Sequence, residues 1–439
     1  MGQGTQRVQV RGECQHHRAA RYNHSMDIAV VGAGPAGIMA ALQASRGGAQ
    51  VTLFDHNARI GRKLLVTGSG RCNLTNQAVS PSAYYGPSTA WMSRFLSEFT
   101  PTDLLRELVA LGAPAFATSD GWYYPLSESA QALTAILEEA LARAGVRLRL
   151  STHISAFSRV NERFRLQIGP AEQRQEESFD ALVAAAGGRA YPELGARGEL
   201  FDSLARLGHT VRPLLPALGP IHASLGAFQA LQGLRFDAQT AILEGGQPLA
   251  ETQGNLIVTA SGFNGPGVMN LSHWPHLRPG RRLTLRINFL GSRSADFDLR
   301  LAARAGSALS LQAFLWGWLP PKAAQVFLSV AGLKGSAALS ALDELQAERL
   351  RQALTGAEFT ISSGGTFRDS QVTVGGVPAE ESAPQSCRSM RVPGLYLVGE
   401  TLDVAGPCGG FNLHFAFGSG YLAGRDLAAP ANLLDKERT

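Results

Sequence analysis

Three glycines, Gly32, Gly34 and Gly37, directly follow a short apolar stretch at 27–31. In this spacing the first glycine permits a tight turn, the second lets the backbone approach a pyrophosphate, and the third lets a helix pack closely on the strand. The helix N-terminus then offers free N–H groups to the phosphates. Asp55 ends a second apolar stretch, where an acid can bind a hydroxyl of the adenosine ribose. An acid at this position argues against a cofactor with a 2′-phosphate. The pattern predicts FAD or NAD and not NADP; an ordinary glycine-rich turn is the alternative.

A second glycine-rich segment, residues 56–76, reads HNARIGRKLLVTGSGRCNLTN. Its turn at 67–70 can present several backbone N–H groups beside hydroxyl groups, which suits a flavin's pyrophosphate, ribityl chain or ring edge. Positive charge lies nearby on Arg62, Lys63 and Arg71. A flexible surface turn is the alternative interpretation.

The C-terminal part of the chain offers further contacts for a flavin. An expected strand at 394–400 ends in Gly399 and Glu400, with Asp403 shortly after, and an acid in this place can bind ribityl hydroxyls. The segment 406–413 then opens the last helix with paired glycines. Such glycines allow close approach to a ring, and the helix N-terminus stabilises negative charge on a reduced flavin.

A reduction also needs a general acid beside the ring, and the candidates are His414, Tyr124 and Cys72. For His414 the alternative is a helix residue that packs beneath the flavin. Tyr124 lies in the aromatic turn 121–125, where core packing is the alternative. Cys408 is considered as a redox-active thiol or a covalent flavin anchor, but a small packing residue is the preferred interpretation.

Composition indicates a globular chain with sizeable cores. Its 439 residues are 45% hydrophobic and 17% charged, which favours two or three domains and argues against extensive disorder. The net charge of +5 gives only weak support for nucleic acid, and the four cysteines show neither a zinc nor a disulfide pattern. The cysteine pattern fits a reducing cytoplasm, and no apolar run could span a bilayer, so we expect a soluble, cytoplasmic protein. Residues 1–25 are expected to be a disordered tail, with Met26 as an alternative start.

The elements that position these residues come from both ends of the chain. An expected strand at 180–188 ends in Gly187 and a second glycine, which would return the chain to the cofactor's edge. Beyond it the pattern changes to short alternating stretches and then to helical periodicity, without a second G-x-G-x-x-G. We therefore expect an FAD-binding domain at 26–189 and 371–430, interrupted by an inserted substrate-side domain at 190–370 that is β-rich at 210–295 and helical at 296–356.

The motifs GAGPAG, GRKLLVTGSGRCNLTN, SQVTVGGV and GLYLVGETLDVAGPCGGFNLHFAFGSG together resemble the bacterial BaiN/YhiN-like family of FAD-dependent oxidoreductases. The resemblance covers about residues 26–427. It implies an α/β fold, with a Rossmann-like, glutathione-reductase-type FAD-binding domain and an inserted β-barrel-like plus helical domain. From the motifs and the resemblance together, the expected cofactor-binding residues are Gly32, Gly34, Pro35, Ala36, Gly37, Asp55, Arg62, Lys63, Gly70, Arg71, Asn73, Gly187, Gly399, Glu400, Asp403, Gly409, Gly410, Phe411 and Asn412.

The expected activity is an NAD(P)H-dependent reductase that passes a hydride from reduced FAD to a small organic acceptor. The chain departs from the family's usual residues at 407–408 and 411–415, so the resemblance does not fix the substrate. One alternative is an oxidase of an amine-like substrate that uses oxygen. Another class is an RNA-modifying or RNA-binding flavoprotein, or a redox sensor without turnover. We expect no metal, no nucleic-acid partner and no membrane partner; the oligomeric state stays open.

Overall fold

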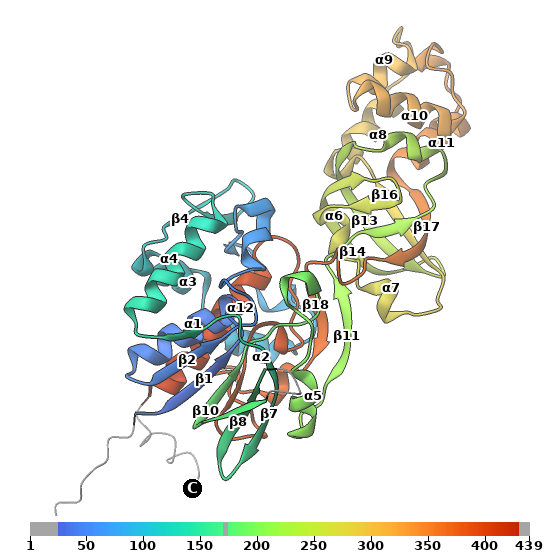
Figure 1. Cartoon of the computed structure of the whole chain (residues 1–439). Coiled ribbons are helices and arrows are strands. Elements are labelled where there is room, and N and C mark those ends of the chain that lie inside the picture. Colours follow the sequence, from blue (N-terminus) through green and yellow to red (C-terminus); the bar gives the residue numbers. More distant parts are fainter. Residues whose placement is uncertain (1–24, 170–173, 430–439) are drawn as a thin grey trace, which may run out of the picture.

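The computed structural model describes residues 25–169 and 174–429 (Figure 1). The predicted disordered tail, apart from Ser25, lies outside these residues. A parallel sheet of five strands, in the order β19-β10-β1-β2-β6, forms the first part of the fold. Its strands are β1 (Asp27–Val31), β2 (Gln50–Phe54), β6 (Arg147–Arg149), β10 (Ala181–Ala184) and β19 (Leu395–Leu397). Because β19 pairs with β10, the two ends of the chain build one sheet.

Two helices from opposite ends of the sequence pack together beside this sheet. α1 (Pro35–Arg46) follows β1, and α12 (Phe411–Ala428) is the last helix. A side chain on Gly420 would put its Cβ 2.0 Å from the carbonyl oxygen of Ala36. The glycine is therefore required for the close approach of the two helices.

Further elements complete this part of the molecule around the sheet. They are the helices α2 (Thr89–Glu98), α3 (Pro101–Leu111), α4 (Ala130–Arg143) and α5 (Phe201–Arg206), the small antiparallel sheet of β3 (Thr75–Asn76), β4 (Ala115–Ala117) and β5 (Trp122–Pro125), and the meander of β7 (Ile154–Val160), β8 (Arg163–Ile168) and β9 (Gln175–Phe179). α3 begins with a capping box between Thr100 and Asp103, which satisfies free N–H groups at its N-terminus.

An antiparallel pair, β11 (Arg212–Ala217) and β18 (Val372–Gly376), leads to and from a second part of the molecule. This part is a closed six-stranded barrel in the order β12-β15-β14-β13-β16-β17. Its strands are β12 (Ile221–Ala223), β13 (Arg235–Glu244), β14 (Gln247–Val258), β15 (Gly262–Asn264), β16 (Leu283–Asn288) and β17 (Ala357–Gly364). Two short helices, α6 (Pro266–Met269) and α7 (Trp274–Leu277), belong to it, and α8 (Ser294–Ala302), α9 (Leu311–Trp316), α10 (Pro321–Ala331) and α11 (Glu344–Thr355) lie at the end away from the parallel sheet (Figure 1).

The barrel and its helices have a hydrophobic core of their own. Phe289 lies 5.2 Å from Phe327 of α10 by ring centroids, so strand and helix residues share this core. A separate core surrounds the parallel sheet. The predicted fold class, a Rossmann-like domain with an inserted barrel and helical part, is confirmed. The last barrel strand, β17, comes after the helical stretch in the chain. It pairs with β16 on one side and with β12 on the other, and this pairing closes the barrel.

Candidate functional site

A cavity of about 580 Å³ lies along the carboxyl ends of the parallel strands and extends to the near end of the barrel. Val31 and Phe54, the last residues of β1 and β2, line it, as does Gly399, two residues after β19. Pro266 and Met269, the two ends of α6, line it from the barrel. Ligands of open α/β sheets bind outside these strand ends, so the cavity has the expected position for a cofactor.

One end of the cavity is built by the glycine turn after β1. The backbone N–H of Ala33 donates to Asp55 Oδ2 at 2.7 Å, which fixes the acid beside the turn. No side chain caps the N-terminus of α1, so its free N–H groups remain available to an anion. A Cβ on Gly37 would lie 1.9 Å from the Gly32 carbonyl oxygen, whereas one on Gly34 would meet nothing within 4 Å. The third glycine therefore serves packing, and the second leaves the backbone open to the cavity.

The other end of the cavity brings the second glycine-rich segment together with the last helix. Ser69 and Gly68 adopt left-handed backbone conformations with φ of 57° and 55°. Across from them, a Cβ on Gly410 would lie 2.6 Å from the carbonyl oxygen of Thr75, so this turn admits only glycine. Asn412 holds the loop in place, because its Oδ1 accepts from Gly406 N–H and its Nδ2 donates to the Gly406 carbonyl, both at 2.8 Å.

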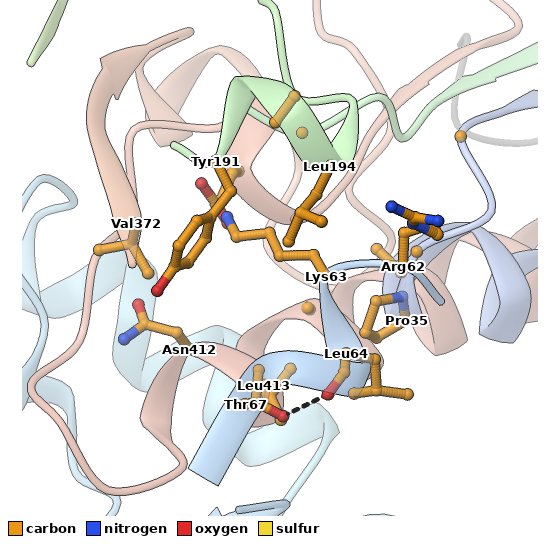
Figure 2. Close-up of a pocket in the computed structure, with 18 of the residues that line it drawn as sticks. Pro35, Arg62, Lys63, Leu64, Thr67, Tyr191, Leu194, Val372, Asn412 and Leu413 are labelled. Atoms are coloured by element: carbon orange, nitrogen blue, oxygen red, sulfur yellow. Dashed lines mark hydrogen bonds and ion pairs between the residues drawn. The ribbon is translucent and has the colours of Figure 1, made fainter. Parts of the chain in front are cut away.

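Charged side chains cross the middle of the cavity. Lys63 Nζ donates to Glu400 Oε1, and Figure 2 shows the lysine side chain extending between Tyr191 and Leu64. The other carboxylate oxygen of Glu400 accepts from the backbone N–H of Thr373 at 3.1 Å. Arg62 lies close to Pro35 in the same view. The site therefore combines an uncapped helix N-terminus with two cations, an arrangement that suits a pyrophosphate.

Most of the predicted cofactor-binding residues line this one cavity. They are Gly32, Gly34, Pro35, Ala36, Asp55, Arg62, Lys63, Asn73, Gly187, Gly399, Glu400, Gly409, Gly410 and Asn412. Gly187 and Gly34 are both open where a Cβ would stand, so the backbone there leaves room for a ligand. The donor set and these open positions fit FAD.

Five predicted residues lie elsewhere: Gly37, Gly70, Arg71, Asp403 and Phe411 do not line the cavity. Arg71 stacks over the ring of Tyr124 at 4.5 Å from the guanidinium carbon. Asp403 is buried and accepts from Arg212 at 2.8 Å. Phe411 is buried too, and its carbonyl accepts from the Tyr84 hydroxyl. These residues support the walls of the site.

The three predicted proton donors also lie outside the cavity. His414 is fully buried on α12, where its Nδ1 lies 3.1 Å from Thr75 Oγ1 and burial lowers its pKa to about 4. Cys72 is fully buried, and burial raises its pKa to about 12. Tyr124 is only 3% exposed, under Arg71.

Among the side chains that line the cavity and carry transferable protons are Tyr191 and Cys408, and neither is one of the three predicted proton donors. Burial raises the pKa of Cys408 to about 12. A signal that could have found Tyr191 is its place three residues after the paired glycines that follow β10, because segments after strand ends reach the cofactor side of an α/β sheet.

The sequence profile of the HI0933-like protein Rossmann domain family matches residues 26–426. The chain belongs to this family. It is 34% identical over 410 residues to the 3-dehydro-bile acid delta(4,6)-reductase of Clostridium scindens, covering 91% of this chain and 98% of the relative. It is 29% identical over 408 residues to a ribosomal RNA dihydrouridine synthase of Escherichia coli, covering 92% and 98%.

A solved structure with a similar fold is the 3-ketosteroid delta1-dehydrogenase of Sterolibacterium denitrificans, with a TM-score of 0.52, 14% identity and coverage of 92% of this chain and 99% of that one. This chain is an FAD-dependent oxidoreductase, as the sequence predicts. The family and its flavoenzyme neighbours support FAD as the cofactor. In the described part of the chain, no group of three or more His, Cys, Asp or Glu side chains is placed to hold a metal. No helix there is both long and apolar enough to cross a membrane.

Proposed function

We propose that the protein reduces a carbon–carbon double bond conjugated to a carbonyl group in a small organic acceptor, with NADH or NADPH as electron donor. The observation that carries the proposal is the apolar wall at the barrel end of the cavity. Leu218, Met269 and Val372 are buried and form this wall beside the glycines expected at the flavin ring. An apolar chamber of this kind excludes water and suits an uncharged acceptor.

The activities named for the two relatives support this bond type. A 3-dehydro-bile acid carries a ketone, and the delta(4,6) double bonds are conjugated with it. The pyrimidine double bond that a dihydrouridine synthase saturates is likewise conjugated to a carbonyl group. A bond of this type can be reduced by adding a hydride to the carbon remote from the carbonyl and a proton to the carbon next to it. The two acceptors differ in size and charge but share one chemical step.

FAD supplies the hydride when it is bound. The turn at 32–36 and Asp55 would hold its adenosine and pyrophosphate, and Lys63 with Glu400 would contact the middle of the molecule. Gly409 and Gly410 line the cavity at the N-terminus of α12, whose dipole favours negative charge there. The apolar wall excludes water from the same place.

The sequence holds no second G-x-G-x-x-G, so we expect no separate Rossmann site for the nicotinamide. We infer that the nicotinamide and the acceptor use the apolar chamber in turn. Steady-state rates at varied concentrations of both substrates should then show ping-pong kinetics. A ternary-complex pattern would contradict this order.

The decisive test is anaerobic spectroscopy of the flavin-loaded protein. We expect NADH or NADPH to bleach the visible flavin band and a conjugated enone to restore it, with the saturated ketone as product. A saturated ketone of the same skeleton serves as the control and should leave the flavin reduced. If no nicotinamide and no enone changes the spectrum, the reductase proposal fails.

A uridine in ribosomal RNA is the second candidate acceptor. It is supported by two relatives named ribosomal RNA dihydrouridine synthase, from Escherichia coli at 29% and Haemophilus influenzae at 26% identity. The expectation of no nucleic-acid partner therefore stays a prediction. Incubation of ribosomal RNA lacking dihydrouridine with reduced enzyme, followed by mass spectrometry of the nucleosides, tests it. A gain of dihydrouridine would assign the RNA, and enone turnover without such a gain would assign the small molecule.

The oxidase and the redox sensor predict other outcomes of the same spectroscopy. An oxidase would be bleached by an amine without nicotinamide and would form peroxide on admission of air. A sensor would be bleached by nicotinamide, but no organic acceptor would restore its colour.

A further inference from the structure

The proposed reduction needs a proton donor as well as a hydride, and this inference rests on that proposed function. A donor must line the chamber near its apolar wall and must keep its proton at neutral pH. His414, Tyr124 and Cys72 do not line the cavity. The donor has to be sought among the side chains that do.

Most proton-carrying side chains of the cavity are placed or bound in ways that exclude them. His153 lies at the end of the cavity near Asp55, and its Nε2 contacts Glu199 Oε2 at 2.7 Å. Lys63 is paired with Glu400. The Thr67 hydroxyl donates to the Leu64 carbonyl at 2.7 Å, as the dashed line in Figure 2 shows. Aliphatic hydroxyls also hold their protons too tightly to act as acids.

Tyr191 meets both requirements. Figure 2 shows its ring pointing into the cavity, with the hydroxyl toward Asn412 and the ring beside Val372 of the apolar wall. Its hydroxyl forms no hydrogen bond with any other described residue, so the proton is free to be given to a ligand. The side chain is half-buried, which leaves solvent a path to return a proton.

The environment of the ring keeps the phenol neutral. Burial raises its pKa above the usual tyrosine value, and the carboxylates of Glu193 and Asp369 raise it further. Cys408 also lines the cavity and stays protonated, but a thiol is a weak hydrogen-bond donor.

The backbone at Tyr191 is strained. Its φ of 60° and ψ of 62° place a bulky side chain in the left-handed region. The conformation is held by a hydrogen bond from its N–H to the Phe367 carbonyl at 2.8 Å, across to the segment that returns from the barrel. Ser69 and Leu218, with φ of 57° and 55°, line the same cavity. Such strain persists where surrounding structure holds it, and it is frequent at functional sites.

We propose that Tyr191 is the proton donor of the reduction. As the hydride forms a bond with the carbon remote from the carbonyl, the O–H bond of Tyr191 breaks and its proton joins the carbon next to the carbonyl. The electron pair of the O–H bond stays on the phenolate oxygen, and solvent then returns a proton to it. The acceptor gains two electrons from the reduced flavin, and the flavin regains them from the nicotinamide.

The test compares Tyr191→Phe with Tyr124→Phe, a tyrosine that the structure places outside the cavity. Oxidation of the prereduced flavin by an enone should slow by at least about 100-fold in Tyr191→Phe and stay unchanged in Tyr124→Phe. Oxidation by ferricyanide takes electrons without a proton transfer to carbon, so it should stay normal in both variants. Calorimetric binding of the enone to the oxidised proteins should also be unchanged.

A product label gives a second readout that loss of packing would not change. In deuterium oxide the wild type should place deuterium on one face of the carbon next to the carbonyl, as seen by NMR. The residual product of Tyr191→Phe should carry it on both faces, because solvent then supplies the proton. Cys408→Ala should keep the single face.

The outcomes separate the two proposals. If the wild type reduces no enone, the proposed function fails and the inference falls with it. If the wild type is active but Tyr191→Phe reacts with the enone at the wild-type rate, Tyr191 is not the donor. If the variant loses enone binding or the ferricyanide reaction as well, Tyr191 has a structural role, and the inference is overturned.

Discussion

The two parts of the molecule contribute to the cavity in different ways. The part around the parallel sheet presents mainly backbone, through the glycine turns at Gly34 and Gly410 and the N-terminus of α1. The barrel side presents side chains, such as Met269, to the apolar wall. Backbone contacts suit a cofactor whose phosphates are the same in every turnover. Side-chain contacts can be varied to fit an acceptor without changing the cofactor site.

One contact between the two parts holds the loop that precedes α12. Asn270, directly after α6, accepts from the backbone N–H of Cys408 at 2.8 Å and donates to Thr252 Oγ1 at 3.2 Å. The barrel therefore holds the loop that leads into Gly409 and Gly410. Changes on the barrel side can reach the flavin only through contacts of this kind, so most should affect the acceptor alone.

The largest expected effect is in the cofactor part, at Gly37. A Cβ there would lie 1.9 Å from the Gly32 carbonyl oxygen, so Gly37→Val must push α1 away from β1. We expect a loss of about 3 kcal/mol or more in the free energy of unfolding, together with loss of flavin. Gly34→Ala is the matched control, since its Cβ meets no atom within 4 Å. It should keep its melting temperature but bind FAD more weakly; equal destabilisation of both variants would contradict the packing argument.

Asp55 should be important for the cofactor and not for the acceptor. Its carboxylate accepts from Ala33 N–H at 2.7 Å and from Asn57 N–H at 2.8 Å. Asp55→Ala removes these charged hydrogen bonds and the expected ribose contact, so we expect about 2 kcal/mol less binding energy for FAD, or roughly 30-fold in Kd. Calorimetry of the flavin-free protein measures it. The exposed acid Asp202 provides the control, and an Asp55→Ala affinity equal to that of Asp202→Ala would remove Asp55 from the site.

A substitution of Met269, on the barrel side, should affect the acceptor and not the binding of FAD. Met269 is 7% exposed and lines the apolar wall, so Met269→Ala enlarges the chamber. We expect the ratio of kcat/KM for a fused-ring enone to that for a single-ring enone to rise about 10-fold. The flavin content should stay at the wild-type level. Met390→Ala, at a methionine that is 72% exposed, should change neither quantity. A Met269→Ala protein without flavin would break the division between the two parts.

The smallest expected effect contrasts an enclosed ion cluster with an exposed pair. Burial opposes the charge on Glu381, but hydrogen bonds from Arg391, Thr210 and His209 hold its pKa at about 2, below the ordinary 4.5. A depressed carboxyl pKa stabilises the fold above pH about 4.5, and the contribution is lost as the pH falls toward 2. Glu381→Gln should therefore cost about 1 to 2 kcal/mol at neutral pH, after allowing for solvent screening, and progressively less in acid.

Denaturant unfolding at several pH values measures this difference. Glu244→Gln removes the exposed pair with Arg281 on the barrel and should leave stability unchanged. A Glu381→Gln cost that is the same at acid and neutral pH would show that hydrogen bonding, and not charge, provides the stabilisation.

The structure shows which expectations could come from sequence. The turn from β1 to α1, the position of Asp55 and the glycines before α12 follow from short motifs, because each depends on residues close together in the chain. The fold class is what the family resemblance implies, and the resemblance rests on the same short motifs. The residues assigned to the cofactor site and the domain boundaries stay predictions.

The proton donors show where sequence reasoning stops. His414 is adjacent in sequence to residues that line the cavity, yet the helical rotation of α12 turns it into the core. Cys72 follows the glycine-rich turn and Tyr124 lies in β5, and both side chains are buried. Residue type and neighbourhood in the chain do not decide the direction in which a side chain points.

The sequence by itself determined that a dinucleotide turn, a second glycine-rich loop and a final glycine-led helix exist, because backbone conformation at glycine turns is a local property. Only the tertiary structure decided that Tyr191 and Met269, from segments far apart in the chain, border one chamber. Their positions depend on how the barrel, with its own core, docks against the parallel-sheet part through β11 and β18. Such docking is a sum of many long-range contacts, and no short motif encodes it.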